Sequence, residues 1–214
     1  MPSRSIPGKR PQKNQEPKPE ITQDPDRELV WAINTGRPEL FPELVKRYEK
    51  RLYNFGMRIC GNTTDAEDLL QDTFLNIYKY LNHFRHETKL KNWIYRIATS
   101  VCIKKKRKSK YAPERALSLD EFLPKETEDS LSHTPDWATQ PLEKILNGEL
   151  SDKIQEAILA LTPKFRLVII LRDVEGFSTE ESAKILGLTP SNVKVRLHRA
   201  RLFVREKLTE YFQP

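Results

Sequence analysis

The segment 178–205 constrains the fold more than any other part of the chain, because its local signals predict two short helices joined by a tight turn. Ser178 and Glu181 form an S-x-x-E capping box at the start of the first helix. Gly187 stands where a helix C-cap takes a positive φ. The pair Thr189–Pro190 then supplies an N-cap followed by proline at the first helical position. This succession is typical of a helix-turn-helix.

The second helix of this motif is apolar on one side and basic on the others. Val193, Leu197, Ala200 and Val204 recur at helical spacing and predict a buried stripe. The remaining faces carry five bases with no acid between them: Lys194, Arg196, Arg199, Arg201 and Arg205. A helix-turn-helix places its second helix in the DNA major groove. The plainer alternative is a solvated helical hairpin with a basic surface.

Length and composition indicate a charge-rich protein with a limited core. The chain has 214 residues, of which 37% are hydrophobic and 31% charged, enough for one large or two small domains. No apolar run approaches the length of a membrane span, and no signal-peptide core is present at the N-terminus. The two cysteines, Cys60 and Cys102, lie in apolar surroundings and predict buried free thiols. We expect a cytoplasmic protein without membrane insertion.

The net charge of +7 is distributed in blocks rather than evenly. The stretch 85–110 holds ten bases and one acid, whereas 111–150 holds three bases and nine acids. The helix-turn-helix is basic again. A basic, acidic, basic order indicates two separate surfaces for a polyanion such as nucleic acid.

The periodicity of apolar residues and the positions of helix-capping and proline residues divide the chain into four parts. Residues 1–25 are rich in proline, which predicts a disordered tail. Residues 26–108 are predicted to form a helical domain, with apolar stripes that begin at Phe41, Ala66 and Trp93. Within this domain Thr64 and Glu67 predict a second capping box. An acidic flexible linker is expected over 109–141 and a second helical domain over 142–214, with Thr162–Pro163 as a helix start. The predicted fold is therefore all-α, with two small helical domains.

Catalysis is not expected. Asp65, Glu67, Asp68 and Asp72 lie near a predicted helix start, where the macrodipole favours acids. No histidine or second ligand set accompanies them, and no phosphate loop or nucleophile motif occurs elsewhere. We expect no enzyme activity, metal or cofactor. A capped, solvated acidic turn and a docking surface for a basic partner remain the two interpretations of this cluster.

The stretch 82–108 mixes aromatic and basic residues, among them Phe84, Arg85, Trp93 and Arg96. This combination suits unpaired bases, which stack on rings while cations hold phosphates. Trp93 also fits a helix core, and the bases at 104–108 also fit a solvated helix end.

Three blocks, in this order, resemble regions 2 and 4 of the extracytoplasmic-function class (group IV) of sigma-70 factors. They are DAEDLLQDTFLNIYKYL (65–81), FRHETKLKNWIYRIAT (84–99) and LTPKFRLVIILRDVEGFSTEESAKILGLTPSNVKVRLHRAR (161–201). The resemblance implies a non-catalytic subunit of bacterial RNA polymerase that directs promoter recognition. It implies as partners the clamp helices of the largest polymerase subunit, the flap of the second-largest subunit, promoter DNA and an anti-sigma factor.

The same resemblance implies roles for individual residues. The polymerase-binding surface corresponds to Asp68, Gln71 and Asp72. The −10 element is bound by a base-capturing loop over 82–89 and by the helix after it, through Asn82, Phe84, Arg85, Lys89, Trp93, Arg96 and Ser100. The −35 element is read by Ser191, Asn192, Lys194, His198 and Arg199, with Arg196 and Arg201 expected on phosphates.

Two departures from the family pattern matter. Relatives often carry Asn where Ser100 stands, so a −10 preference cannot be transferred, and Trp93 is followed by Ile94 rather than by a second tryptophan. The second departure indicates an alternative factor with weaker strand opening. The competing functions are a dimeric helix-turn-helix regulator that binds an operator, and an interaction module resembling an anti-sigma factor, which leaves the basic helix unexplained.

Overall fold

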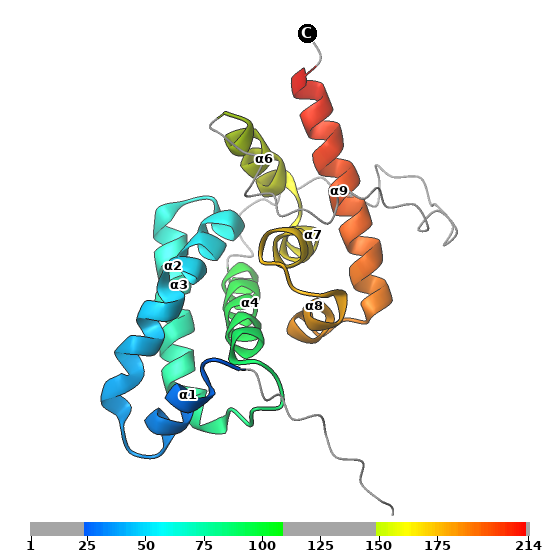
Figure 1. Ribbon diagram of the computed structural model, residues 1–214. Coiled ribbons are helices and arrows are strands. Elements are labelled where there is room, and N and C mark those ends of the chain that lie inside the picture. Colours follow the sequence, from blue (N-terminus) through cyan, green and yellow to red (C-terminus); the bar gives the residue numbers. More distant parts are fainter. Residues whose placement is uncertain (1–23, 109–148, 213–214) are drawn as a thin grey trace, which may run out of the picture.

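The computed structural model describes residues 24–108 and 149–212, and every regular element within these ranges is helical (Figure 1). The all-α class is thereby confirmed. The tail expected over 1–25 lies outside the described residues except for its last two positions. The linker expected over 109–141 lies wholly outside them.

The N-terminal domain is built around a long antiparallel helix pair. Its elements are α1 (Arg27–Asn34), the 3-10 turn η1 (Pro38–Leu40), α2 (Phe41–Cys60), α3 (Thr63–Tyr80), the 3-10 turn η2 (Leu81–His83) and α4 (Leu90–Lys108). Gly56 allows α2 and α3 to approach closely, because a Cβ there would lie 3.2 Å from the backbone of Ala66. Leu44, Leu52 and Ile77 fill the space between the helices and are fully buried.

The turn between α2 and α3 differs in one detail from the sequence prediction. Gly61 ends α2 with a φ of 79°, as a left-handed C-cap requires. The capping box predicted at Thr64 and Glu67 is wrong, since α3 begins two residues earlier with Asn62 as its N-cap. The Asn62 side chain accepts from the Asp65 backbone N–H at 2.8 Å and donates its amide to the Asp65 carboxylate at 2.8 Å. Asparagine is as good an N-cap as threonine or better, and its amide adds this second bond.

The C-terminal domain consists of short helices closed by one long helix. They are α6 (Glu149–Ala160), α7 (Pro163–Ile169), the π-helical turn η6 (Ile170–Val174), α8 (Thr179–Leu186) and α9 (Pro190–Phe212). Pro163 occupies the first turn of α7 as predicted, but the Thr162 side chain makes no capping bond. The apolar segment 165–174 has the composition of one continuous helix. It is α-helical to Ile169 and then widens into the π turn.

The helix-turn-helix forms at α8 and α9 through the predicted local signals. Glu181 N–H donates to the Ser178 hydroxyl at 3.0 Å, and Ser178 N–H donates to the Glu181 carboxylate at 2.9 Å, which completes the capping box. Gly187 then takes a φ of 67°. The Thr189 hydroxyl accepts from the Asn192 N–H at 3.2 Å at the start of α9.

Candidate nucleic-acid interface

One face of α9 is buried and the opposite face is available to a ligand. Val193, Leu197 and Ala200 are buried in the C-terminal core, beside α7 and α8. With 3.6 residues per turn, the side chains between these positions point away from the domain. Of the predicted −35 residues, three are exposed and three are partly exposed: Ser191, Asn192 and Lys194, then Arg196, His198 and Arg199.

Arg201 differs from the other bases of α9. Its guanidinium makes a bidentate pair with the carboxylate of Asp173 in the π turn, at 2.8 Å from Nε and 2.6 Å from Nη2. Both side chains are less than one-fifth exposed. Two parallel charge-assisted bonds fix the orientation of a guanidinium. Arg201 therefore joins α9 to the segment that leads into α8.

A groove of about 550 Å³ runs between α3 and α4. From α3 it is lined by Asp72, Asn76 and Tyr80, and from α4 chiefly by Trp93, Arg96, Ser100 and Lys104. The helices are antiparallel, so Tyr80 and Trp93 form an aromatic end beside the loop, and Asp72 and Lys104 form a charged end. The structure thus brings three predicted −10 residues together with one residue predicted to bind polymerase.

The loop 82–89 places its predicted residues in two environments. Asn82, Arg85 and Lys89 are exposed, whereas Phe84 is only 6% exposed. The Phe84 ring lies 5.3 Å from that of Trp93 and 4.7 Å from that of His86. His86 has a φ of +55°, an uncommon conformation for a residue with a Cβ. Phe84 is therefore a support beneath the loop and is not available as a stacking platform.

The exposed face of α3 that carries the predicted polymerase-binding residues includes two further residues that the sequence analysis does not predict. Asp68 and Gln71 are exposed and Asp72 is partly exposed. One and two turns further along the helix, Leu75 and Tyr78 are 60% and 61% exposed. Tyr78 makes an edge-to-face contact with Phe41 at 5.0 Å. The sequence does contain a signal for these two residues. Leu75 and Tyr78 follow Gln71 at helical spacing, so they lie on the same face as the acidic residues and not on the buried apolar stripe.

The two domains contact each other through α4. The Tyr95 hydroxyl donates to the Glu175 carboxylate, and the Lys91 ammonium donates to the Glu175 backbone carbonyl at 2.9 Å. The amide of Asn92 donates to Glu181 of α8 at 3.0 Å. Burial lowers the pKa of Lys91, whose ammonium also lies 4.3 Å from the centre of the Phe177 ring. These contacts use the side of α4 that faces α8 and leave the Trp93 side to the groove.

Arg166 makes a second connection between the domains. Its guanidinium donates to the backbone carbonyls of Ile59 in α2 at 2.6 Å and Leu161 at 2.8 Å, and also to that of Leu159. Burial lowers the pKa of this side chain. The buried guanidinium of Arg166 therefore donates hydrogen bonds to backbone carbonyls of both domains.

Over 24–108 and 149–212, no helix combines the length and the apolar character of a membrane span. The same ranges hold no group of three or more His, Cys, Asp or Glu side chains arranged to bind a metal ion.

Two family models match the chain, one to each domain. Residues 44–111 match sigma-70 region 2, and residues 151–204 match sigma-70 region 4. The chain is 32% identical over 184 residues to the ECF RNA polymerase sigma factor SigW of Bacillus subtilis (strain 168). That similarity covers 86% of this chain and 97% of SigW.

Solved structures share the fold of this chain. The sigma factor RpoE of Bartonella quintana, in complex with the anti-sigma factor NepR, superposes with a TM-score of 0.57 at 25% identity, covering 79% of this chain and 96% of RpoE. CnrH, in complex with the cytosolic domain of CnrY, superposes with a TM-score of 0.59 at 21% identity, covering 88% and 99%. The chain belongs to the sigma-70 family and is an alternative sigma factor of the ECF class, which directs the initiation of transcription.

Proposed function

We propose that this factor reads a promoter at two places, with α9 on the −35 duplex and the α3–α4 groove on the opened −10 strand. The observation that carries the proposal is that two separate surfaces have the chemistry that suits nucleic acid. One is the exposed basic face of a helix-turn-helix. The other is a groove that combines rings with cations.

At the −35 element, Ser191, Asn192, Lys194, His198 and Arg199 contact base edges in the major groove. Arg196, at the margin of the exposed face, contacts a phosphate. We assign Arg201 a positioning role in place of the phosphate contact expected from the sequence, because its guanidinium is bonded to Asp173.

At the −10 element, the loop 82–89 receives a base flipped out of the non-template strand. Extruding a base costs a few kcal/mol, which stacking and edge contacts repay. Asn82, Arg85 and Lys89 are exposed at this loop and are suited to contact the base and its phosphates. The strand then follows the groove past Trp93, Arg96 and Ser100. Phe84 holds Trp93 in place from below.

The exposed face of α3 binds core polymerase. Asp68, Gln71 and Asp72 meet the clamp helices of the largest subunit, with Leu75 and Tyr78 as the apolar part of the same surface. An apolar centre beside polar groups is the usual composition of a protein interface. The C-terminal domain binds the flap of the second-largest subunit. Since RpoE of Bartonella quintana binds an anti-sigma factor, we also propose one here, acting in the cytoplasm where polymerase works.

Binding of polymerase must separate the two domains. The numbers in their names place the −35 and −10 elements about 25 base pairs apart, which is about 85 Å along the duplex. In the structure the domains touch directly, through α4 with α8 and α2 with α6. A molecule closed in this way cannot occupy both elements at once, so the contacts of Glu175 and Arg166 have to break.

The test is run-off transcription with purified core polymerase. We expect promoter-dependent transcripts on addition of the chain, and none with Asp72→Arg, because the reversed charge repels a basic docking partner. Glu49→Arg, an exposed reversal on α2, is the matched control and should retain activity. A chain that binds a palindromic duplex as a dimer and never stimulates polymerase would establish the operator-binding alternative.

A further inference from the structure

We propose that Asp24 and Asn34 are positioning residues that fix the two ends of the loop 82–89, so that the N-terminal segment 24–34 shapes the −10 site without touching DNA. The inference rests on the proposed role of that loop in base capture. The first two residues of this segment belong to the tail that the sequence predicts to be disordered.

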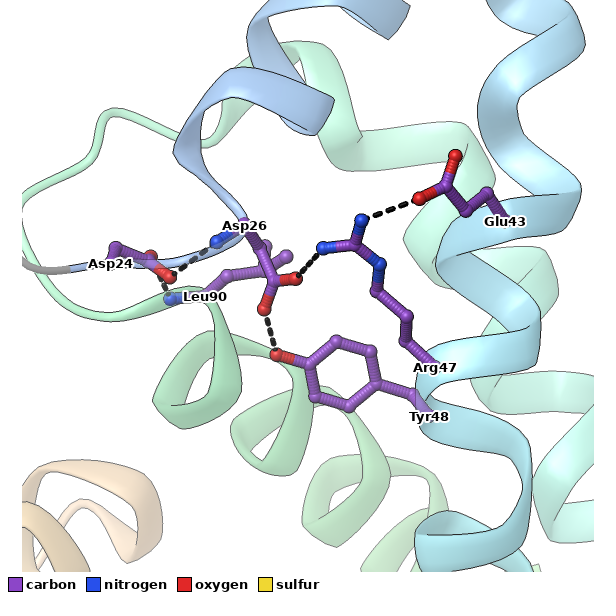
Figure 2. Close-up of polar contacts among 6 residues, drawn as sticks. All are labelled: Asp24, Asp26, Glu43, Arg47, Tyr48 and Leu90. Carbon is purple, nitrogen blue, oxygen red and sulfur yellow. Dashed lines mark hydrogen bonds and ion pairs between the residues drawn. The ribbon is translucent and has the colours of Figure 1, made fainter.

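The downstream end of the loop is held by Asp24. Its carboxylate accepts a hydrogen bond from the backbone N–H of Leu90 at 2.6 Å, and Leu90 is the first residue of α4 (Figure 2). The first N–H groups of a helix have no partner within the helix, and a carboxylate also suits the positive end of the macrodipole. Asp24 thus caps α4 from a position 66 residues away in the sequence.

The upstream end of the loop is held by Asn34, the last residue of α1. Its amide donates to the backbone carbonyl of Leu81 at 3.2 Å. Leu81 opens the 3-10 turn that follows α3 and precedes the loop. One short segment, 24–34, therefore bonds to the chain immediately before and immediately after the loop 82–89.

The segment is itself attached firmly to α2 through Asp26, which is 6% exposed. The Asp26 carboxylate accepts from the Tyr48 hydroxyl at 2.5 Å and from the Arg47 guanidinium at 2.9 Å (Figure 2). Burial and the neighbouring Asp26 carboxylate raise the pKa of Tyr48, so its hydroxyl remains a donor at any physiological pH. Arg47 also pairs with Glu43, which fixes the guanidinium from a second side.

Fixing both ends reduces the number of conformations open to the loop, because the entropy of a loop depends on how its ends are constrained. The loop contains the left-handed His86 and the exposed Asn82, Arg85 and Lys89. A site whose groups are already placed spends less binding energy on ordering them. Loosening either end should lower the discrimination for the captured base more than it lowers the stability of the domain.

The variants are Asp24→Ala and Asn34→Ala, and the matched control is Asn62→Ala. Asn62 caps α3 by the same kind of bond, but the 18-residue helix separates it from the loop by about 27 Å at 1.5 Å per residue. Asp24→Asn retains an oxygen acceptor for Leu90 N–H and should restore the wild-type behaviour. Thermal unfolding and co-purification with core polymerase show that each variant folds and docks.

The first readout is amide hydrogen exchange in the free, full-length protein, which needs no DNA. We expect faster exchange over 82–90 in Asp24→Ala and Asn34→Ala, and no change there in Asn62→Ala. The second readout is the fluorescence of 2-aminopurine placed in the −10 non-template strand of a promoter bound by holoenzyme. Discrimination between the preferred base and its replacements should fall about 3–10-fold in the two variants, as expected for losing one hydrogen bond.

Unchanged exchange over 82–90 in both variants would overturn the inference. So would a loss of discrimination no greater than that of Asn62→Ala. If wild-type holoenzyme itself gives no fluorescence rise at any −10 position, base capture by this loop is refuted, whatever the exchange data show. The two failures are therefore distinguishable.

Discussion

The ring of Tyr95 lies between the aromatic cores of both domains, and its hydroxyl is bonded to Glu175, 80 residues further along the chain. The ring centre is 5.2 Å from that of Phe55 in α2 and 4.9 Å from that of Phe177 beside α8. Tyr95 has no exposed surface. In the free protein the described residues thus form one continuous core, and the ring of Tyr95 packs against rings of both domains within it.

Tyr95→Phe should shift the free protein toward an open arrangement. The substitution keeps the ring but removes the donor to a charged group, which costs about 1–3 kcal/mol. We expect a larger radius of gyration in small-angle X-ray scattering. Tyr53→Phe on α2 is the control and should scatter like the wild type. A Tyr95→Phe profile identical to that of the wild type would show that this bond does not hold the domains together.

Glu181 should make the stability of the closed form sensitive to acid. Burial acts to raise the pKa of its carboxyl, but the Ser178 N–H, the Asn92 amide and nearby lysines outweigh it, so the pKa lies below the ordinary 4.5. The ionised form is favoured in the folded state. Its contribution is complete above about pH 4.5 and is lost as the pH falls through the lower folded value.

The measurement for Glu181 is the thermal midpoint from about pH 6 to pH 3, the range in which carboxylates take up protons. The midpoint of Glu181→Gln should start lower and fall less steeply than that of the wild type. Glu180→Gln, an exposed neighbour on α8, should follow the wild-type curve. Parallel curves for Glu181→Gln and the wild type would contradict the assignment.

Arg201→Ala should destabilise the C-terminal domain by about 1–3 kcal/mol, because it leaves the Asp173 carboxylate without its bidentate partner. Asp173→Ala should cost a similar amount, and the double variant little more than either single one. Denaturant unfolding of the wild type and the three variants gives the free energies of unfolding for this double-mutant cycle. Additive losses in stability would contradict the pairing with Asp173. A reduced salt dependence of DNA binding in Arg201→Ala alone would support the phosphate contact expected from the sequence.

Lys194→Ala should weaken promoter binding by holoenzyme by about 1–3 kcal/mol and relax preference at one base pair of the −35 element, if Lys194 contacts a base edge. Competition binding against a set of −35 substitutions measures both effects. Lys46→Ala removes an exposed lysine from α2 and should leave −35 preference unchanged. A uniform loss across all −35 sequences would identify Lys194 as a phosphate contact.

The sequence predicted the helix-turn-helix well because its signals are local. The capping box of Ser178 with Glu181, the left-handed Gly187 and the Thr189 cap each involve residues within a few positions of one another. Such features form with little help from the rest of the fold. The sequence predicts the cap of α3 two residues too late, because Thr64 and Asn62 are both good N-cap residues and only the folded geometry distinguishes them.

The remaining differences depend on contacts between distant segments. Phe84 reads as a stacking residue in a basic loop, yet Trp93 and His86 enclose it. Asp24 reads as the end of a polar tail, yet its partner is Leu90. Arg201 resembles its basic neighbours until Asp173 is brought beside it. Burial and pairing of this kind are set by tertiary packing, which no window of sequence contains.

The shared core has a consequence for promoter architecture. In the free chain the two domains are held in contact, so nothing in that arrangement encodes the number of base pairs between the two elements. If the factor reads its promoter as proposed, that number follows from how far apart polymerase holds the two domains once it has separated them. Variants of the Tyr95–Glu175 contact should therefore initiate more or less readily, while the optimal spacer length stays the same.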